Sequence, residues 1–140
     1  KHGQKCSAKV SSAEKTSCVL NGTSAANKVV TNARLTRGDR VLCDRNNHKS
    51  NHHGALIQAG ATPVYLEAAR NPFGFIGGID EHCFDEAYLR NLIRDVAPDK
   101  AADARPFRLA VLQLGPYAGT HYHPPQVIDK NGTHLEFLLF

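Results

Sequence analysis

Short apolar runs alternate with amphipathic segments along most of the chain. The apolar runs have strand length and are bounded by turn-forming residues, whereas the amphipathic segments repeat their apolar positions at helical spacing. This alternation is typical of parallel strands joined by crossover helices. The sequence therefore predicts an α/β fold, with a mostly parallel sheet and helices on both of its faces. The predicted strands are residues 17–20, 40–44, 62–67, 107–114 and 136–140.

Two segments have the clearest helical periodicity. The first has apolar residues at 26, 29, 30 and 33 and should end near Gly38, because a glycine after a basic last turn commonly ends a helix. The second runs from Phe84 to about Ala97, where Pro98 ends it. Residues 68–82 are rich in turn formers and are predicted to be a loop, whose aromatic side chains are candidates to line a site.

The two ends of the chain differ in what they predict. Residues 1–16 are polar and have no clear assignment, so the predicted domain covers residues 17–140. Pro124 and Pro125 can begin a helix, where a missing N–H costs little, and an apolar strand follows. A buried strand would normally continue into a loop at its carboxyl end. We therefore expect a partial domain, truncated within a longer protein.

Composition excludes some classes of function. The 140 residues carry a net charge of +4 with no run of five or more like charges, which gives nucleic-acid binding little support. No stretch approaches the roughly 18 apolar residues of a membrane helix, and the start of the chain lacks a signal-peptide core. Cys6, Cys18, Cys43 and Cys83 lack metal-type spacing and fit free thiols in a reducing compartment. We expect a cytoplasmic protein without a membrane segment.

The carboxyl ends of parallel strands are where such sheets bind ligands, so the residues just after each predicted strand are candidates. After the first strand, Gly22, Thr23 and Ser24 offer a glycine, two hydroxyls and free backbone N–H groups at the start of a helix. This combination predicts a phosphate cradle. The alternative is that Thr23 or Ser24 only caps the helix.

A dense polar cluster, residues 44–50, follows the second predicted strand. Within it, His48 could stack its imidazole on a flat cofactor or transfer a proton, and its alternative is an ordinary exposed loop residue. Lys49 is expected to be an exposed lysine rather than one that binds a cofactor covalently, since that role needs a desolvated amine.

Three histidines in this region raise the question of a metal site. His48 and His52 are spaced to share a helix face, and His53 follows directly. No glutamate lies between them in the His-Glu-x-x-His manner, and nothing fixes a third ligand. We therefore predict no metal site.

Together these segments resemble a known family. The run from Asn21 to Lys28, followed by Gly38-Asp39 and by Asp44 to Ser50, closely resembles the bacterial ornithine/lysine/arginine decarboxylases. The similarity continues through residues 51–67 and 71–79, and within the family it is greatest to inducible ornithine decarboxylases. The resemblance covers roughly residues 19–140 and is strongest up to Gly78.

The resemblance implies part of the large domain of a pyridoxal phosphate (PLP) enzyme with the aspartate aminotransferase fold. It implies decarboxylation of a small basic amino acid, with ornithine converted to putrescine and CO₂, in a homodimer or larger homo-oligomer. Gly22, Thr23 and Ser24 fall where the family binds the cofactor phosphate, and His48 falls where a histidine stacks over the pyridine ring. The family's cofactor-binding lysine and its aspartate against the pyridine nitrogen would lie beyond Phe140, so this segment alone is expected to be inactive.

The chain also departs from the family pattern. Pro116 and Ala118 stand where the family usually has a threonine and an aspartate, and Tyr122-His123-Pro124 stands where it has Tyr-Asn-Ala. Polar groups on the cofactor side are thereby lost. An alternative function is therefore a catalytically silent binding or assembly protein with the PLP fold. A nucleotide-binding module is a further alternative, but it lacks the G-x-G-x-x-G and G-x-x-x-x-G-K-[ST] motifs.

Overall fold

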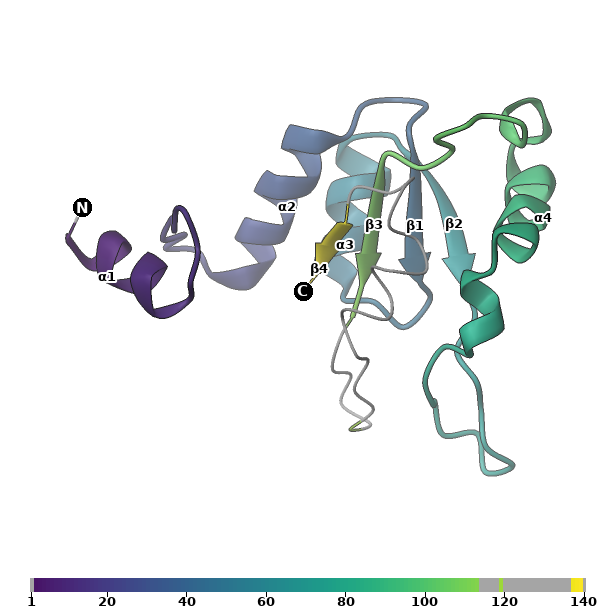
Figure 1. The fold of residues 1–140 in the computed structure, drawn as a ribbon, viewed down its shortest axis with the longest axis horizontal. Coiled ribbons are helices and arrows are strands. Elements are labelled where there is room, and N and C mark those ends of the chain that lie inside the picture. The colour runs from purple at the N-terminus through teal and green to yellow at the C-terminus, as the bar shows by residue number, and fades with distance from the viewer. Residues whose placement is uncertain (1, 114–118, 120–136, 140) are drawn as a thin grey trace.

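Among the residues that the structure describes, the sheet has four strands, all parallel, in the order β2-β1-β3-β4 (Figure 1). The computed structural model describes residues 2–113, 119 and 137–139. The strands are β1 (Arg40–Asp44), β2 (Thr62–Leu66), β3 (Leu109–Leu112) and β4 (Phe137–Leu139). The predicted α/β fold is confirmed, and four of the five predicted strands are present: β1 has the predicted bounds, and the other three are shorter within the described residues.

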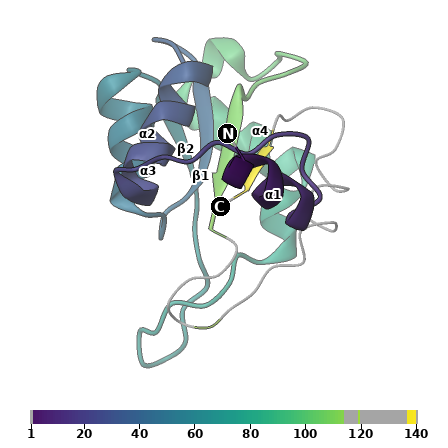
Figure 2. The same ribbon diagram turned by 90° about the vertical axis from the view of Figure 1, so that its left-hand side faces the viewer.

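Helices lie on both faces of the sheet, as Figure 2 shows. One face is covered by α2 (Gly22–Arg34) and by α3 (Lys49–His52), which continues as a π-helix, His53–Gln58. The other face is covered by α4 (Glu86–Val96). Short 3₁₀ turns, Glu81–Phe84 and Pro98–Lys100, flank α4. None of the helices in the described part of the chain is long and apolar enough to span a membrane.

The core consists of two apolar layers, one on each face of the sheet. Successive residues of β1 alternate between them: Val41 and Cys43 belong to the layer beneath α2 and α3, whereas Leu42 belongs to the layer beneath α4. This alternation follows from the two-residue period of a strand, and a strand buried on both faces reads as a continuous apolar run. The apolar runs at β1 and β3 are therefore explained by their central position in the sheet.

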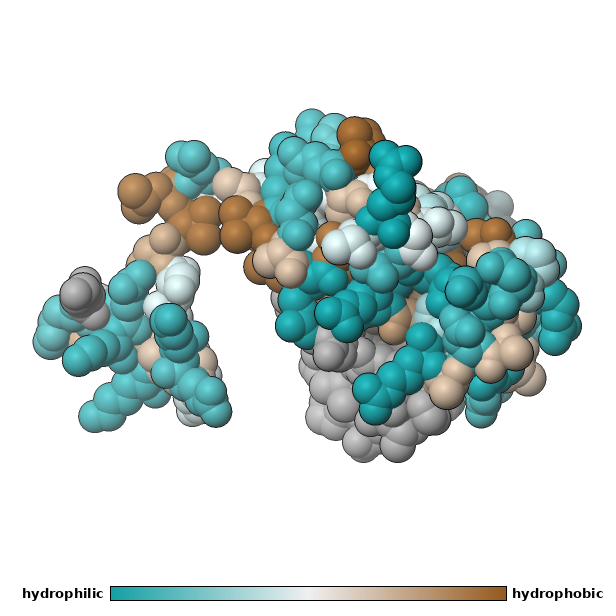
Figure 3. Space-filling view, turned by 90° about the horizontal axis from the view of Figure 1, so that it is seen from above, coloured by the Kyte–Doolittle hydropathy of each residue, from teal (hydrophilic) through white to brown (hydrophobic). Residues whose placement is uncertain are grey.

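The predicted strand at residues 17–20 is wrong. No regular structure forms there, and Val19 and Leu20 are 41% and 96% exposed. Figure 3 shows apolar side chains on the surface of the segment that joins α1 (His2–Val10) to α2. A strand needs a neighbour to satisfy its backbone N–H and C=O groups, and none of the described strands pairs with this segment. The local apolar run was therefore insufficient to form a strand.

The N-terminal helix α1 (His2–Val10) was not predicted. It lies apart from the sheet (Figure 1), and Ala8 is its single buried residue among those described. A helix without an apolar face leaves no periodic pattern in the sequence. The predicted helix at Pro124, and all of the loop at residues 115–123 except Gly119, lie outside the described residues.

Helix α2 packs closely on the π-helix at Gly54. A Cβ atom built at Gly54 would lie 2.2 Å from Oγ1 of Thr31 and 3.2 Å from Cα of Lys28. Thr31 is fully buried, and its hydroxyl donates to the carbonyl of Asn27, one turn earlier. Only glycine therefore allows this close approach, which sets how near α2 lies to the segment that follows β1.

We predict that Gly54→Ala lowers the free energy of unfolding by about 2 kcal/mol, because the added methyl group overpacks this contact. Urea unfolding of the chain measures the loss. Adding Thr31→Ala should recover part of it, since the nearest clashing atom is then removed. Gly3→Ala is the control, because nothing lies within 4 Å of a Cβ at Gly3. Equal stability of the Gly54→Ala and Gly3→Ala proteins would contradict the close packing.

Candidate functional site

The strand order reverses at β1, because β2 lies on one side of it and β3 on the other. The chain leaves β1 towards α3 on one face, whereas it reaches β3 from α4 on the opposite face. Open parallel sheets bind ligands beyond the carboxyl ends of their strands at such a reversal. The carboxyl ends of β1 and β3 are therefore the place to look for a site.

A pocket of about 620 Å³ lies at this place. Three segments line it: the loop after β1, the loop before α4 and the residue that follows β3. A volume of this size is in the range that holds small-molecule ligands, roughly 300–1,000 Å³. The lining residues are Asn46, Asn47, His48, Lys49, Gly74, Phe75, Ile76 and Gln113.

Asn47 holds the loop after β1 in place. Its amide Nδ2 donates to the Asp44 carboxylate and, at 2.8 Å, to the carbonyl oxygen of Val111 in β3. Its Oδ1 accepts from the backbone N–H of His48 at 2.9 Å and from Nδ2 of Asn51 at 2.6 Å. One side chain therefore ties β1, β3 and α3 together at the pocket.

Asp44 is the buried acid of the site, with 5% of its surface exposed. Burial raises the pKa of its carboxyl above the ordinary value of 3.8, and hydrogen bonds from Asn47 and from the backbone of Gln113 partly oppose this rise. Asp44 does not line the pocket, so its position suits it to supporting the loop rather than to touching a ligand.

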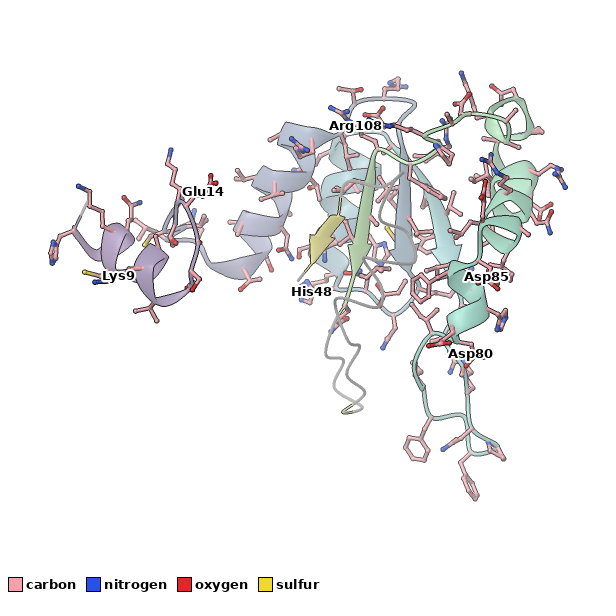
Figure 4. All side chains as sticks on the ribbon, in the orientation of Figure 1. Lys9, Glu14, His48, Asp80, Asp85 and Arg108 are labelled. Atoms are coloured by element: carbon pink, nitrogen blue, oxygen red, sulfur yellow. The ribbon has the colours of Figure 1, made fainter. Side chains whose placement is uncertain are left out.

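His48 lies at the end of the sheet to which the strands point (Figure 4). It is the N-cap of α3: its Nδ1 accepts from the backbone N–H of Ser50 at 3.2 Å. The Ser50 hydroxyl also lies 2.8 Å from Nδ1. The His48 side chain is otherwise exposed on the pocket wall. His48 therefore caps α3 and lines the pocket at the same time, so its hydrogen bonds distinguish it from an ordinary exposed loop residue.

Gly22, Thr23 and Ser24 form the exposed first turn of α2. The N-cap is Asn21, so neither Thr23 nor Ser24 occupies that position, and the Asn21 side chain makes no capping hydrogen bond. The first N–H groups of a helix have no partner within it, and this first turn holds no acidic residue. Helix α2 begins at the same end of the sheet as His48 (Figures 1 and 4). These three residues do not line the pocket that the described residues form.

The other histidines of the region do not join His48. His52 lies beside Tyr65 instead, with its Nδ1 3.5 Å from the phenol oxygen, and His53 is exposed. Within residues 2–113, no group of three or more His, Cys, Asp or Glu side chains is arranged to hold a metal ion. Lys49 is exposed at the start of α3.

Sequence reasoning missed the residues that support His48. Asn27 of α2 donates from Nδ2 to the Ser50 hydroxyl at 2.9 Å, although 23 positions separate them. No local pattern signals such a contact, because it depends on how α2 packs. The aromatic loop was better predicted: Phe75 lines the pocket, although 70% of its surface is exposed, whereas Phe73 is 86% exposed and does not line it.

Comparison with known proteins gives a consistent result. The family model described as "Orn/Lys/Arg decarboxylase, major domain" matches residues 1–140. The constitutive ornithine decarboxylase of Escherichia coli K12 is 72% identical over 140 residues, which is 100% of this chain and 20% of that protein. The inducible ornithine decarboxylase of the same organism is 69% identical over 137 residues, 98% of this chain and 19% of that protein.

A solved structure of a related decarboxylase has the same fold over almost the whole of this chain. Lysine decarboxylase A from Pseudomonas aeruginosa superposes with a TM-score of 0.87 at 34% identity, covering 99% of this chain and 18% of that one. The chain therefore spans about a fifth of the length of the curated relatives it matches.

We predict that Cys43 resists alkylation in the folded protein. Burial, with a smaller contribution from the Asp44 charge, raises the pKa of its thiol to about 12, so almost no reactive thiolate exists at pH 8. Cys6 and Cys18 are exposed and should react with iodoacetamide first. Mass spectrometry of peptides from native and urea-unfolded samples measures the difference. Equal labelling of Cys43 and Cys18 in the native sample would contradict the burial.

A second prediction concerns Asp44 and pH. Because the folded-state pKa is raised, the folded protein keeps this proton to a higher pH than the unfolded chain does. The Asp44 contribution to stability therefore falls as pH rises from about 4. We expect the free energy of unfolding of Asp44→Asn, relative to that of the unchanged protein, to increase between pH 4 and pH 8 in urea titrations. A difference that is independent of pH would show that the pKa is not raised.

Proposed function

The chain belongs to the Orn/Lys/Arg decarboxylase family, and we propose that it serves within a longer PLP-dependent enzyme that decarboxylates a basic amino acid. The observation that carries the proposal is the pocket at the carboxyl ends of β1 and β3, with His48 on its wall. His48 lies within the motif block that resembles the family most closely. We propose a cytoplasmic homo-oligomer, in line with the sequence expectation.

We propose ornithine as the substrate, with putrescine and CO₂ as products. The supporting observation is that identity to the two Escherichia coli ornithine decarboxylases is about twice that to the Pseudomonas aeruginosa lysine decarboxylase structure. The preference for ornithine follows from this difference in identity.

The described residues fit PLP in three respects. The pocket of about 620 Å³ is large enough for a molecule of this size. The imidazole of His48 is exposed on its wall. A Cβ at Gly22 would meet no atom within 4 Å, so the space beside the first turn of α2 is open, and no acidic side chain of that turn would repel a phosphate.

Each proposed residue has a separate role. The backbone N–H groups of Gly22, Thr23 and Ser24, with the two hydroxyls, would bind the phosphate at the positive end of α2. His48 would stack on the pyridine ring and keep it from rotating. Bound PLP supplies the electron sink for the charge left on Cα when CO₂ departs, and the protein supplies binding and orientation. Correct orientation of a reacting bond is worth several kcal/mol.

A chimeric decarboxylase tests the proposal. It consists of the Escherichia coli constitutive ornithine decarboxylase with its matching segment replaced by this chain, 72% identical over 140 residues. We expect it to bind PLP, seen as visible absorbance of the purified protein, and to release CO₂ from ornithine. A folded chimera that binds no PLP would favour the catalytically silent alternative, and a preference for lysine would overturn the choice of substrate.

Within this chimera, we predict that His48→Ala weakens PLP binding and lowers kcat by about tenfold or more, which corresponds to about 1.4 kcal/mol. The reason is that the cofactor ring loses its stacking partner. His53→Ala is the matched control, because His53 is an exposed histidine five positions along that does not line the pocket. Equal effects of the two substitutions would argue against the stacking role.

A further inference from the structure

The ring nitrogen Nδ1 of His48 faces two donors. The backbone N–H of Ser50 lies 3.2 Å from it, and the Ser50 hydroxyl oxygen lies 2.8 Å from it. A backbone N–H can only donate, so Nδ1 must accept. An accepting Nδ1 carries no proton, and the imidazole then carries its proton on Nε2. The backbone geometry of α3 therefore selects one of the two tautomers of His48.

The Ser50 hydroxyl has a defined direction for the same reason. Nδ2 of Asn27 donates to the Ser50 oxygen at 2.9 Å, which leaves the Ser50 proton free to point at Nδ1. If the Asn27 amide were turned over, its oxygen would take the Ser50 proton, and Nδ1 would need a proton of its own to reach Ser50. That proton would face the donating N–H of Ser50. The hydrogen bonds are therefore all satisfied only if Asn27 donates to Ser50 and Ser50 donates to His48.

Two of these three side chains are buried, and one is exposed. Asn27 and Ser50 each have 3% of their surface exposed, whereas His48 presents its ring to the pocket. This arrangement has an energetic cost, because Oδ1 of Asn27 is buried without a hydrogen-bond partner among the described residues. A buried polar atom without a partner is destabilising, so the presence of Asn27 at this position needs an explanation. The explanation is the hydrogen bond that its Nδ2 donates to Ser50, which in turn contacts His48.

We propose that Asn27 and Ser50 are positioning residues that fix both the orientation and the tautomer of His48. They act through His48 rather than by touching the ligand, since both side chains are buried, with 3% of their surface exposed. Asn27 belongs to α2, whose first turn is the proposed phosphate cradle. The hydrogen bonds from Asn27 through Ser50 to His48 therefore connect the helix that carries the cradle to the proposed stacking residue. This inference rests on the proposed role of His48 in PLP binding.

The chain offers a matched control in Asn32. Its Nδ2 donates to Oε1 of Gln58 at 3.0 Å, so it also joins α2 to the segment after β1 by an amide hydrogen bond. Asn32 is exposed and makes no contact with His48 or Ser50 among its hydrogen bonds. A purely structural role in holding α2 would affect both asparagines, whereas a positioning role affects Asn27 alone.

Nuclear magnetic resonance of the chimeric decarboxylase without PLP tests the tautomer. Histidine is labelled with ¹⁵N, and the signals of His48 are identified as those lost in His48→Ala. We expect Nδ1 to have the shift of an unprotonated nitrogen and Nε2 that of a protonated one. In Ser50→Ala the backbone N–H that selects the tautomer remains, so Nδ1 should stay unprotonated, but the ring loses the hydroxyl contact and its signals should report a more mobile ring. A protonated Nδ1 in the unchanged protein would overturn the inference, whatever PLP does.

A double-mutant cycle on the PLP dissociation constant tests the positioning. We expect Ser50→Ala to weaken PLP binding about fivefold, the usual effect of one lost hydrogen bond, and Asn27→Ala to weaken it by a smaller factor. In the His48→Ala background, Ser50→Ala should change the constant by less than about twofold, because the residue it acts through is gone. The circular dichroism of bound PLP should change in Ser50→Ala and stay unchanged in Asn32→Ala.

The outcomes separate the two ideas. If His48→Ala weakens PLP binding but Ser50→Ala does not, the positioning role is wrong and the proposed function stands. If Ser50→Ala weakens binding equally in both backgrounds, or Asn32→Ala matches Asn27→Ala, the effect is structural and the inference fails. If His48→Ala leaves PLP binding unchanged, the stacking role and the positioning role both fail.

Discussion

The side-chain amide of Asn47 is the contact on which the site depends. It satisfies the Asp44 carboxylate and a carbonyl of β3 with its Nδ2, and it accepts from His48 and Asn51 with its Oδ1. A loop that leaves the buried end of a central strand carries polar groups into a dry region, where each unpaired group is costly. Asn47 meets that need with one residue, and in doing so it fixes where the next residue, His48, begins α3.

The position of α2 is fixed by a different kind of contact. Gly54 admits the buried Thr31 side chain, so α2 lies against the π-helix more closely than any residue with a Cβ would permit. This close packing brings Asn27 within hydrogen-bond reach of Ser50. Steric packing thus determines a polar contact beside the pocket. A change in the apolar interface of α2 would therefore be transmitted to His48 without any change in the pocket lining.

The sequence predicted the parts of the fold that local pattern controls. The apolar runs of β1 and β2 and the periodicity of α2 and α4 were sufficient, because each element buries one face or both against the same core. The strand expected at residues 17–20 failed because pairing is a long-range property that an apolar run alone cannot supply. Likewise, the position of His48 at the pocket could be predicted from its place after a strand, whereas that of Asn27 could not, since its contact with Ser50 spans 23 positions and arises only from packing.

The site combines rigid and open parts in a way that suits cofactor binding. The groups that set geometry, Asp44, Asn27 and Ser50, are buried and hydrogen-bonded, whereas the groups proposed to touch PLP, His48 and the first turn of α2, are exposed. Because the buried groups are already fixed, binding would not have to order them and would lose less conformational entropy. The first N–H groups of α2, which have no partner within the helix, keep their capacity for an anion because, among the described residues, neither the Asn21 side chain nor an acid in the first turn competes for them. The fixed position of His48 thus follows from how α2 is held, whereas the availability of the helix end follows from its uncapped first turn.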